Sequence, residues 1–204
     1  MVFTFAAYSE TRKFLSVKKF LFILALCATA WSVRAQESTF NQGDIVINAG
    51  VGFGSTIYSG RFYTMQVPPI SVSGEYALIE DFIEEGITLG VGGFIGYSRS
   101  RFRAGPRGPN EYGWRYNYTI IGVRGALHYP LIDDLDTYAG AMLSINSLSS
   151  AAFGNVPPEL SPASSGIGLS LFVGGRYWFK EKIAAMGEFG WGVTFANIGV
   201  AIKI

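Results

Sequence analysis

The sequence contains little cysteine, little histidine and little charge. Of its 204 residues, one is a cysteine and one a histidine, and charged residues make up 15%, whereas soluble domains have about 25%. The lone cysteine, Cys27, cannot form a disulfide within the chain, which excludes a disulfide-stabilised scaffold. Beyond residue 35 there is no apolar run of helix length. A transmembrane helix needs about 20 apolar residues, so membrane-spanning helices are excluded there too.

Glycine and aromatic residues are abundant instead. The chain has 26 glycines, 16 phenylalanines, 11 tyrosines and 4 tryptophans. Glycine weakens the interior of a helix by about 1 kcal/mol relative to alanine. The composition therefore disfavours a helical protein and favours closely packed strands flanked by aromatic girdles.

The first 35 residues have the features of an export signal. Lys18 and Lys19 form a basic region, residues 20–31 are an apolar run of 12, and residues 33–35 end in a small residue. We expect a signal peptide at 1–35, cleavage after Ala35, and a mature domain at 36–204. An uncleaved membrane anchor is the alternative. Residues 1–16 lengthen the basic region, which leaves the true start of translation open.

The expected mature domain has no cysteine, and its 11 basic and 14 acidic residues give a net charge of −3. This balance gives no reason to expect nucleic acid as a partner. No carboxylates have the spacing of a metal site within one loop. Glycine-rich pieces such as Gly90–Gly93 lack the lysine that a phosphate-binding loop requires. We therefore expect no cofactor and no metal.

Eight segments of the mature domain alternate apolar residues with small or polar ones, the pattern of β-strands. In residues 167–179 one face carries isoleucine, leucine, valine and aromatic residues, and the other is rich in glycine and serine. In residues 114–129 the two halves have opposite parity, so we expect a β-bulge near Ile120 and Ile121. The predicted strands are about 44–55, 69–79, 87–98, 114–129, 137–146, 167–179, 183–192 and 196–204.

An apolar face opposite a face of glycine and serine suits a closed barrel with lipid outside and a narrow polar interior. The predicted strands have the length of transmembrane strands, about 9–11 residues. The expected loops at 56–67, 99–113 and 147–164 are long and those between them short, as in outer-membrane barrels. The predicted fold is therefore an all-β, eight-stranded antiparallel up-and-down transmembrane β-barrel. A soluble lipocalin-type barrel, with its apolar face inward, is the alternative.

Five stretches resemble a known family: Ile121–Tyr129 (IGVRGALHY), Tyr138–Met142 (YAGAM), Gly174–Phe179 (GGRYWF), Met186–Gly192 (MGEFGWG) and Asn197–Ile204 (NIGVAIKI). They resemble the outer-membrane β-barrel domain of the OmpA/OmpX-like group of Gram-negative bacteria, a likeness that covers most of residues 40–204. It implies location in the outer membrane and insertion by the barrel-assembly machinery, and it is specific for architecture rather than activity. Family members usually end on an aromatic residue. This chain ends on Ile204, so we expect that machinery to recognise it more weakly or differently.

Charged residues also fall on the face predicted to line the interior. Arg176 and Glu188 lie on neighbouring predicted strands within a diagonal step, and Arg124 is expected to reach across the interior to them. We expect Arg124, Arg176 and Glu188 to form an ion-paired plug, because a buried unpaired charge is costly. The alternative is a gate in a narrow ion path.

His128, the single histidine, is expected on the inner face beside Tyr138, near the periplasmic end. A lipid-modifying enzyme would need this imidazole next to a hydroxyl nucleophile and facing the lipid. The sequence therefore does not favour an enzyme, and we assign no catalytic residue.

Arg99, Arg101 and Arg103 continue the parity of the outward residues before them, so they are expected just above the outer aromatic girdle. At that level arginine can bind the phosphates of lipopolysaccharide bidentately; the alternative is that these are solvated loop residues. Acidic residues gather at the opposite, periplasmic turns: Glu80, Asp81, Glu84, Glu85, Asp133, Asp134 and Asp136.

These observations predict a monomeric outer-membrane barrel that has a structural or surface-interaction role and displays its loops to the exterior. Outer-membrane lipid and lipopolysaccharide are its expected partners. A narrow porin-like channel for ions or small solutes is the second hypothesis, and an outer-membrane lipid-modifying enzyme is the third.

Overall fold

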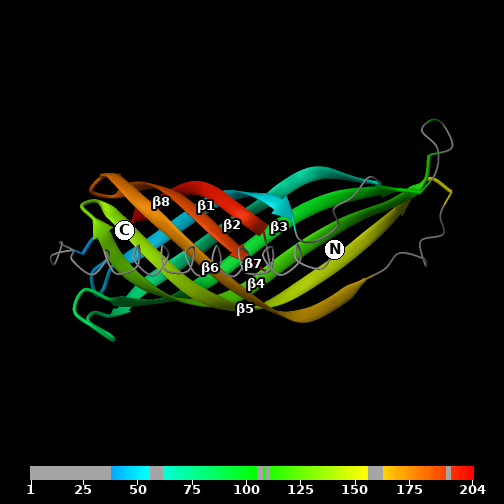
Figure 1. The fold of residues 1–204 in the computed structure, drawn as a ribbon. Coiled ribbons are helices and arrows are strands. Elements are labelled where there is room, and N and C mark those ends of the chain that lie inside the picture. The colour runs from blue at the N-terminus through cyan, green and yellow to red at the C-terminus, as the bar shows by residue number, and fades with distance from the viewer. Residues whose placement is uncertain (1–37, 56–61, 105–107, 109–110, 156–162, 192–193) are drawn as a thin grey trace, which may run out of the picture. The chain divides into compact units, whose positions relative to one another are not determined.

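The computed structural model describes residues 38–55, 62–104, 108, 111–155, 163–191 and 194–204, which form eight strands (Figure 1). The strands are β1 (Ile45–Ser55), β2 (Tyr63–Ile79), β3 (Thr88–Arg103), β4 (Gly113–Ile132), β5 (Leu135–Phe153), β6 (Ser164–Lys180), β7 (Ile183–Trp191) and β8 (Thr194–Lys203). Within these residues no helix has the length and apolarity to cross a membrane. The predicted signal peptide lies outside the described residues and stays a prediction.

Every strand pairs antiparallel with its neighbours in the sequence, and the sheet closes on itself. Closure is made by β1 and β8, which pair from Val46–Lys203 to Ser55–Thr194. The prediction of an eight-stranded antiparallel up-and-down barrel is confirmed. Closure pairs the edges that an open sheet would expose.

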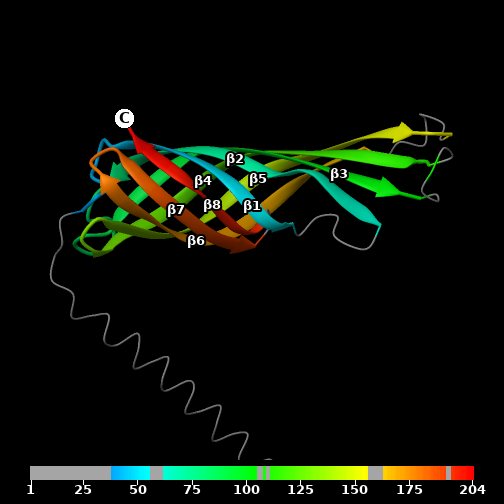
Figure 2. The same ribbon diagram turned by 90° about the horizontal axis from the view of Figure 1, so that it is seen from above.

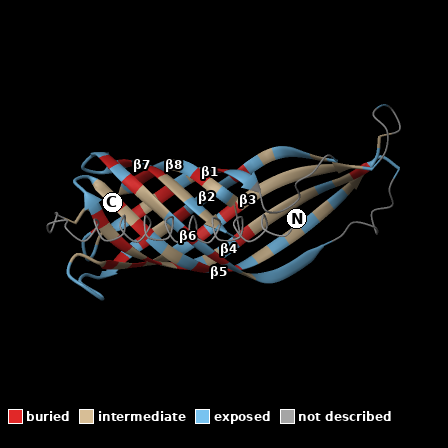
Figure 3. Cartoon of the chain, viewed as in Figure 1, coloured by how far each residue is buried: buried red, intermediate tan, exposed pale blue. Residues whose placement is uncertain are grey.

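Buried and exposed residues alternate along the strands (Figure 3). The outer wall is apolar, whereas the interior holds polar and charged side chains together with several large apolar ones. One row of paired residues on neighbouring strands shows this: Val72, Ile95, Ile121, Ile145 and Ile167 lie side by side. Each of them is exposed, and Ile167 reaches 82%. The predicted outward positions of these five residues are confirmed.

The connections differ between the two ends of the barrel. At one end, the short-turn end, they comprise residues 80–87, 133–134 and 181–182; at the other end, they include 56–62, 104–112 and 154–163. Figure 1 places the C-terminus at the short-turn end. The predicted alternation of long and short connections holds for the four connections from 104–112 to 181–182. It does not hold for the first two, because 56–62 spans seven residues and 80–87 spans eight.

Four strands continue beyond the closed barrel at the long-loop end. We call this extension the distal sheet and define it by Tyr63–Val67, Arg99–Arg103, Gly113–Asn117 and Ser149–Phe153, which pair with one another. Figure 2 shows β3, β4 and β5 reaching well past the ends of β1, β7 and β8. The predicted loops at 56–67, 99–113 and 147–164 were thus too long, because residues at their ends pair in strands.

The predicted bulge near Ile120 is absent. β3 and β4 pair without a register shift from Thr88–His128 to Arg103–Gly113. Ile120 is 2% exposed and belongs to an interior cluster against which Tyr118 packs. The prediction was wrong because it assumed that apolar residues always face outward. Here aromatic and aliphatic residues fill the part of the interior that lies nearer the long-loop end.

Candidate functional site

Two clusters of charged side chains stand out on this scaffold. The first, the ionic layer, crosses the interior of the barrel and consists of Glu75, Arg124, His128, Asp136, Arg176 and Glu188. The second, the arginine face, lies on the outward side of the distal sheet and consists of Arg99, Arg101, Arg103 and Arg115.

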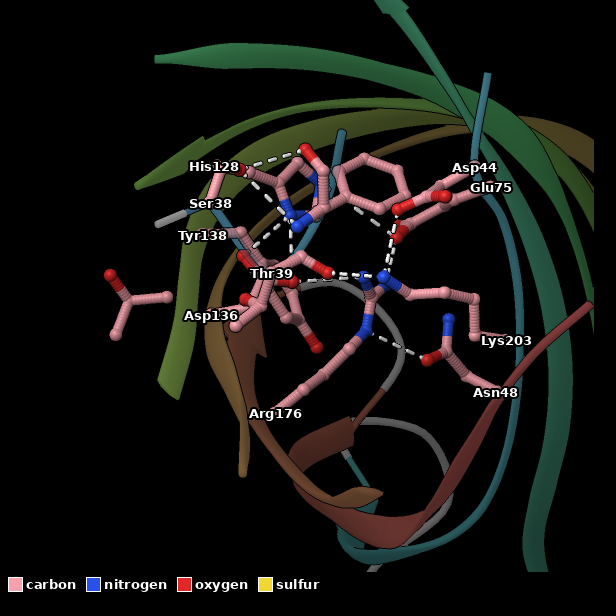
Figure 4. A network of polar contacts seen from close by, with 12 residues as sticks. Ser38, Thr39, Asp44, Asn48, Glu75, His128, Asp136, Tyr138, Arg176 and Lys203 are labelled. Atoms are coloured by element: carbon pink, nitrogen blue, oxygen red, sulfur yellow. Dashed lines mark hydrogen bonds and ion pairs between the residues drawn. The ribbon is translucent and has the colours of Figure 1, made fainter. Parts of the chain in front are cut away.

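Arg176 is the centre of the ionic layer (Figure 4). Its side chain is 0% exposed, which would be very unfavourable for an unpaired guanidinium. It donates to Asp136 Oδ2 at 3.1 Å, to Asn48 Oδ1 at 3.0 Å and to Glu75 Oε2. Carboxylates from two other strands, β2 and β5, therefore compensate its charge, and β1 supplies a neutral hydrogen-bond acceptor.

Arg124 connects Glu75 to Glu188, the member of the layer that lies nearer the long-loop end. Its Nη2 donates to Glu188 Oε2 at 2.7 Å. Its Nε lies 2.7 Å from Glu75 Oε1, an ion pair without hydrogen-bond alignment. The guanidinium carbon also stands 3.9 Å from the centre of the Phe172 ring, and Tyr138 donates to Glu188 at 3.3 Å. Glu75 thus bridges the two arginines.

His128 is 2% exposed and faces the interior, as predicted. Its Nδ1 lies 3.0 Å from Asp136 Oδ1, and its ring is 5.1 Å from that of Tyr138, the expected neighbour, and 4.3 Å from that of Phe40. The expectation that Asp136 lies in a periplasmic turn is wrong, because it belongs to β5 and is 2% exposed. The imidazole does not reach the outer wall.

The predicted contact between Arg176 and Glu188 is replaced by another pairing. Arg176 lies opposite Met186 in the β6–β7 register, and its partners are Glu75 and Asp136, while Glu188 pairs with Arg124. The structure therefore brings Arg124 and Glu188 together and gives Arg176 other carboxylates. Glu75 and Asp136 were not predicted as members of the plug, although both have the inward parity of their strands.

Glycines make room for these long side chains. Gly92 stands between Glu75 on β2 and Arg124 on β4 in the register. Gly174 stands in the same way between Tyr138 and Glu188, and a Cβ there would lie 2.6 Å from the Tyr138 ring. In each case two polar side chains from the flanking strands meet over the glycine, which has no side chain to separate them.

Replacing Gly92 with alanine is expected to destabilise the barrel by about 1–3 kcal/mol, the usual cost of overpacking. A Cβ at Gly92 would overlap the carbonyl oxygen of Gly74 and touch the backbone of Glu75. Gly93 is the matched control, since the nearest atom to a Cβ there is 3.9 Å away. Denaturant unfolding in lipid vesicles measures both variants. Equal stability of Gly92→Ala and Gly93→Ala would contradict the expectation.

A cap segment, residues Ser38–Asp44, closes the short-turn end. Phe40 is 1% exposed and packs against His128 and Arg176. Lys203 holds the segment through the Thr39 carbonyl at 2.7 Å and Asp44 at 2.8 Å. The ionic layer is therefore covered on this side by an aromatic ring.

A cavity of about 40 Å³ lies on the other side of the layer. Its floor includes Arg124 and Glu188, and Phe94, Ile120 and Phe172 are among its walls. That volume holds a few water molecules but not a ring the size of benzene, which occupies cavities of about 150 Å³. Between the cavity and the short-turn end, the interior is filled by the side chains of the ionic layer and the cap segment.

On the arginine face, the three predicted arginines lie on β3 rather than in a loop. Arg99 Nε donates to Asn117 Oδ1 at 2.7 Å. Arg101 and Arg103 share Glu111, at 2.8 and 2.7 Å. Strand pairing and these contacts fix the three side chains on the outward side of the distal sheet.

No family model and no curated protein matches the sequence. Solved structures do match it. Outer membrane protein OprG from Pseudomonas aeruginosa aligns with 82% of this chain and 99% of its own, at 10% identity and a TM-score of 0.50.

Two others are the attachment invasion locus protein Ail of Yersinia pestis, in complex with sucrose octasulfate, and the N-terminal barrel domain of Pseudomonas aeruginosa OprF. Ail aligns with 80% of this chain and 96% of its own, at 11% identity and a TM-score of 0.47. The OprF domain aligns with 80% of this chain and 98% of its own, at 13% identity and a TM-score of 0.45. The predicted resemblance is confirmed at the level of the fold: this chain folds as an eight-stranded barrel of the outer-membrane type.

Proposed function

We propose that the protein is a barrel of the bacterial outer membrane with a structural or surface-interaction role, which displays the distal sheet to the exterior. The observation that carries this proposal is the inverted distribution of side chains. Val123, Ile145 and Leu169 are each about two-thirds exposed on the outer wall, at 66%, 65% and 66%, while Arg176 is buried inside. A soluble protein rarely exposes an apolar surface larger than a few hundred Å². Lipid around the barrel would keep this apolar surface out of water, so that its exposure costs no hydration free energy.

The two ends support one orientation in the membrane. Outer-membrane barrels have short periplasmic turns and longer extracellular loops, which places the acidic turns in the periplasm and the distal sheet outside. The protein then reaches its location through the expected signal peptide and the barrel-assembly machinery, and it works as a monomer without enzymatic activity. The arginines Arg99, Arg101 and Arg103 then contact lipopolysaccharide.

This orientation predicts which positions can be labelled on intact cells. Since the expected mature chain has no cysteine, single cysteines report cleanly. Ser149→Cys, on the distal sheet, is expected to react with a membrane-impermeant maleimide; Glu181→Cys, in a short turn, is expected to react only after the outer membrane is permeabilised. The wild type is the control. The purified protein should also change its mobility on an unboiled gel. A soluble protein without that shift, or labelling of Glu181→Cys on intact cells, would end the proposal.

We also propose that the barrel conducts no ions, because the ionic layer and the cap segment fill its interior. In planar bilayers we expect the purified protein to produce no ionic current at any voltage. Stepwise currents that disappear when Arg124 or Glu188 is replaced would favour the channel hypothesis instead.

A further inference from the structure

We propose that Arg101, Arg115 and Phe153 form a clamp for phosphate groups on the saccharide core of lipopolysaccharide. The inference rests on the proposed location in the outer membrane. It adds two residues, Arg115 and Phe153, to the arginines expected to contact this lipid, and it identifies which part of the lipid they bind.

The first argument is the geometry of the pair. Arg101 on β3 and Arg115 on β4 are direct cross-strand partners. Phe153 on β5 lies beside them, with its ring centre 4.1 Å from the Arg101 guanidinium carbon and 5.5 Å from that of Arg115. A planar guanidinium over an aromatic ring can still donate hydrogen bonds from its edge. In Arg101 part of that edge is occupied, because Nη2 pairs with Glu111. The two forks are thus held side by side on one platform.

The second argument is charge. Like charges directly opposite each other destabilise a strand pair. The described residues of this face include four arginines and one nearby glutamate, Glu111, a net charge of +3. Arg101 shares Glu111 with Arg103, whereas Arg115 is exposed and has no carboxylate partner among the described residues. A phosphate dianion between Arg101 and Arg115 would remove the repulsion and accept hydrogen bonds from both.

The third argument is height above the membrane. Tyr97 is the last aromatic residue on the outward side of β3 before the arginines, and Arg101 lies four residues beyond it. At 3.3 Å per residue and a tilt near 40°, Arg101 and its partner Arg115 stand about 10 Å above that residue. Phospholipid headgroups extend only about 5–7 Å beyond the hydrocarbon. The clamp therefore stands level with sugar-borne phosphates and above those of phospholipids.

The fourth argument is rigidity. The arginines lie on paired strands, and β4 pairs with both β3 and β5 through this region. A site that is already ordered loses little conformational entropy when it binds. This distinguishes the clamp from arginines in a solvated loop, which would have to be ordered by the ligand.

The experiment measures binding of three probes to the purified full-length mature barrel in neutral detergent. The probes are lipopolysaccharide with a phosphorylated core, lipopolysaccharide whose core lacks phosphate but whose lipid A keeps it, and phosphatidylglycerol. Arg115→Ala is expected to bind the first probe at least tenfold more weakly than the wild type and to bind the second unchanged. Phe153→Leu should show a smaller loss. Arg115→Lys keeps the charge without the fork and should recover only part of the affinity.

Lys182→Ala, which removes a cation at the opposite end, is the matched control, and the gel-mobility shift verifies that every variant is folded. Unchanged binding in Arg115→Ala, or an equal loss for both lipopolysaccharides, would overturn the clamp. A loss of affinity in Arg99→Ala and Arg103→Ala, with none in Arg115→Ala, would support contact with lipopolysaccharide but contradict the clamp. If the wild type binds neither lipopolysaccharide, the clamp and the lipopolysaccharide contact both fall, whereas labelling on cells tests the membrane location separately.

Discussion

Arg176→Met is expected to destabilise the barrel by about 3–5 kcal/mol, the usual cost of breaking a buried ion pair by removing one partner. The side chain is 0% exposed and compensates Glu75 and Asp136, which are also buried. Methionine fills similar space but provides no charge. Denaturant unfolding in phospholipid vesicles, followed by tryptophan fluorescence, gives the free energy of unfolding.

Net charge explains why the loss of an arginine costs more than the loss of a carboxylate in this layer. Apart from His128, the layer has two arginines and three carboxylates. Without Arg176, three buried carboxylates face a single arginine. Adding Glu75→Gln and Asp136→Asn to Arg176→Met removes two of the uncompensated charges and is expected to restore part of the lost stability.

Glu188→Gln is the matched control, because it changes the same layer in the opposite direction. Glu188 is 13% exposed in its side chain, and its partner Arg124 also has Glu75. The expected loss is about 1–2 kcal/mol, that of a weakened charge-assisted hydrogen bond. Equal losses for Arg176→Met and Glu188→Gln would contradict the pairing in the structure. A double variant whose loss is smaller than the sum of the two single losses would indicate that the two residues pair with each other, as the sequence suggested.

The membrane-embedded part of the barrel could be predicted from the sequence because alternation there has a single cause. A residue such as Val123 faces out and its neighbour Arg124 faces in, and each has a side chain suited to its surroundings. The distal sheet breaks this rule. There Arg101 faces outward and Phe102 inward, where it lies 6.1 Å from Trp114. A pattern that assumes lipid outside ends the strands too early.

The ionic layer was only partly predictable for a different reason. Parity tells which side of the wall a side chain occupies, but not which strands across the interior come close. Arg176 reaches Glu75, 101 residues away in the sequence, and that contact depends on how the whole barrel closes. Asp136 was placed in a turn because acidic residues cluster around it, although it pairs with Pro130 as part of β5.

The cap segment gave no signal that a strand pattern could detect. Phe40 lies before β1 in a stretch without alternation, and its position depends on Lys203 at the other end of the chain. One aromatic residue in an irregular segment is uninformative by itself. Only the closed barrel, which brings β1 and β8 together, shows that Phe40 covers His128 and Arg176.

Phe40→Ala is therefore expected to destabilise the barrel by about 3 kcal/mol, at the lower end of the range for a buried phenylalanine. The ring is 1% exposed and packs 4.3 Å from the imidazole of His128. Its removal leaves a gap under the ionic layer at the short-turn end, where water can reach buried charges. The measurement is again the free energy of unfolding in vesicles.

Gln42→Ala provides the comparison within the same segment. Gln42 is exposed, and its side chain makes one hydrogen bond, to the Leu78 carbonyl at 3.1 Å, so its loss is expected to cost about 0.5–1 kcal/mol. Phe40→Leu should lie between the two, because leucine keeps part of the apolar volume. If Phe40→Ala were no less stable than Gln42→Ala, the segment would contribute only its backbone contacts. The ring would then not be what seals the ionic layer from the periplasmic side.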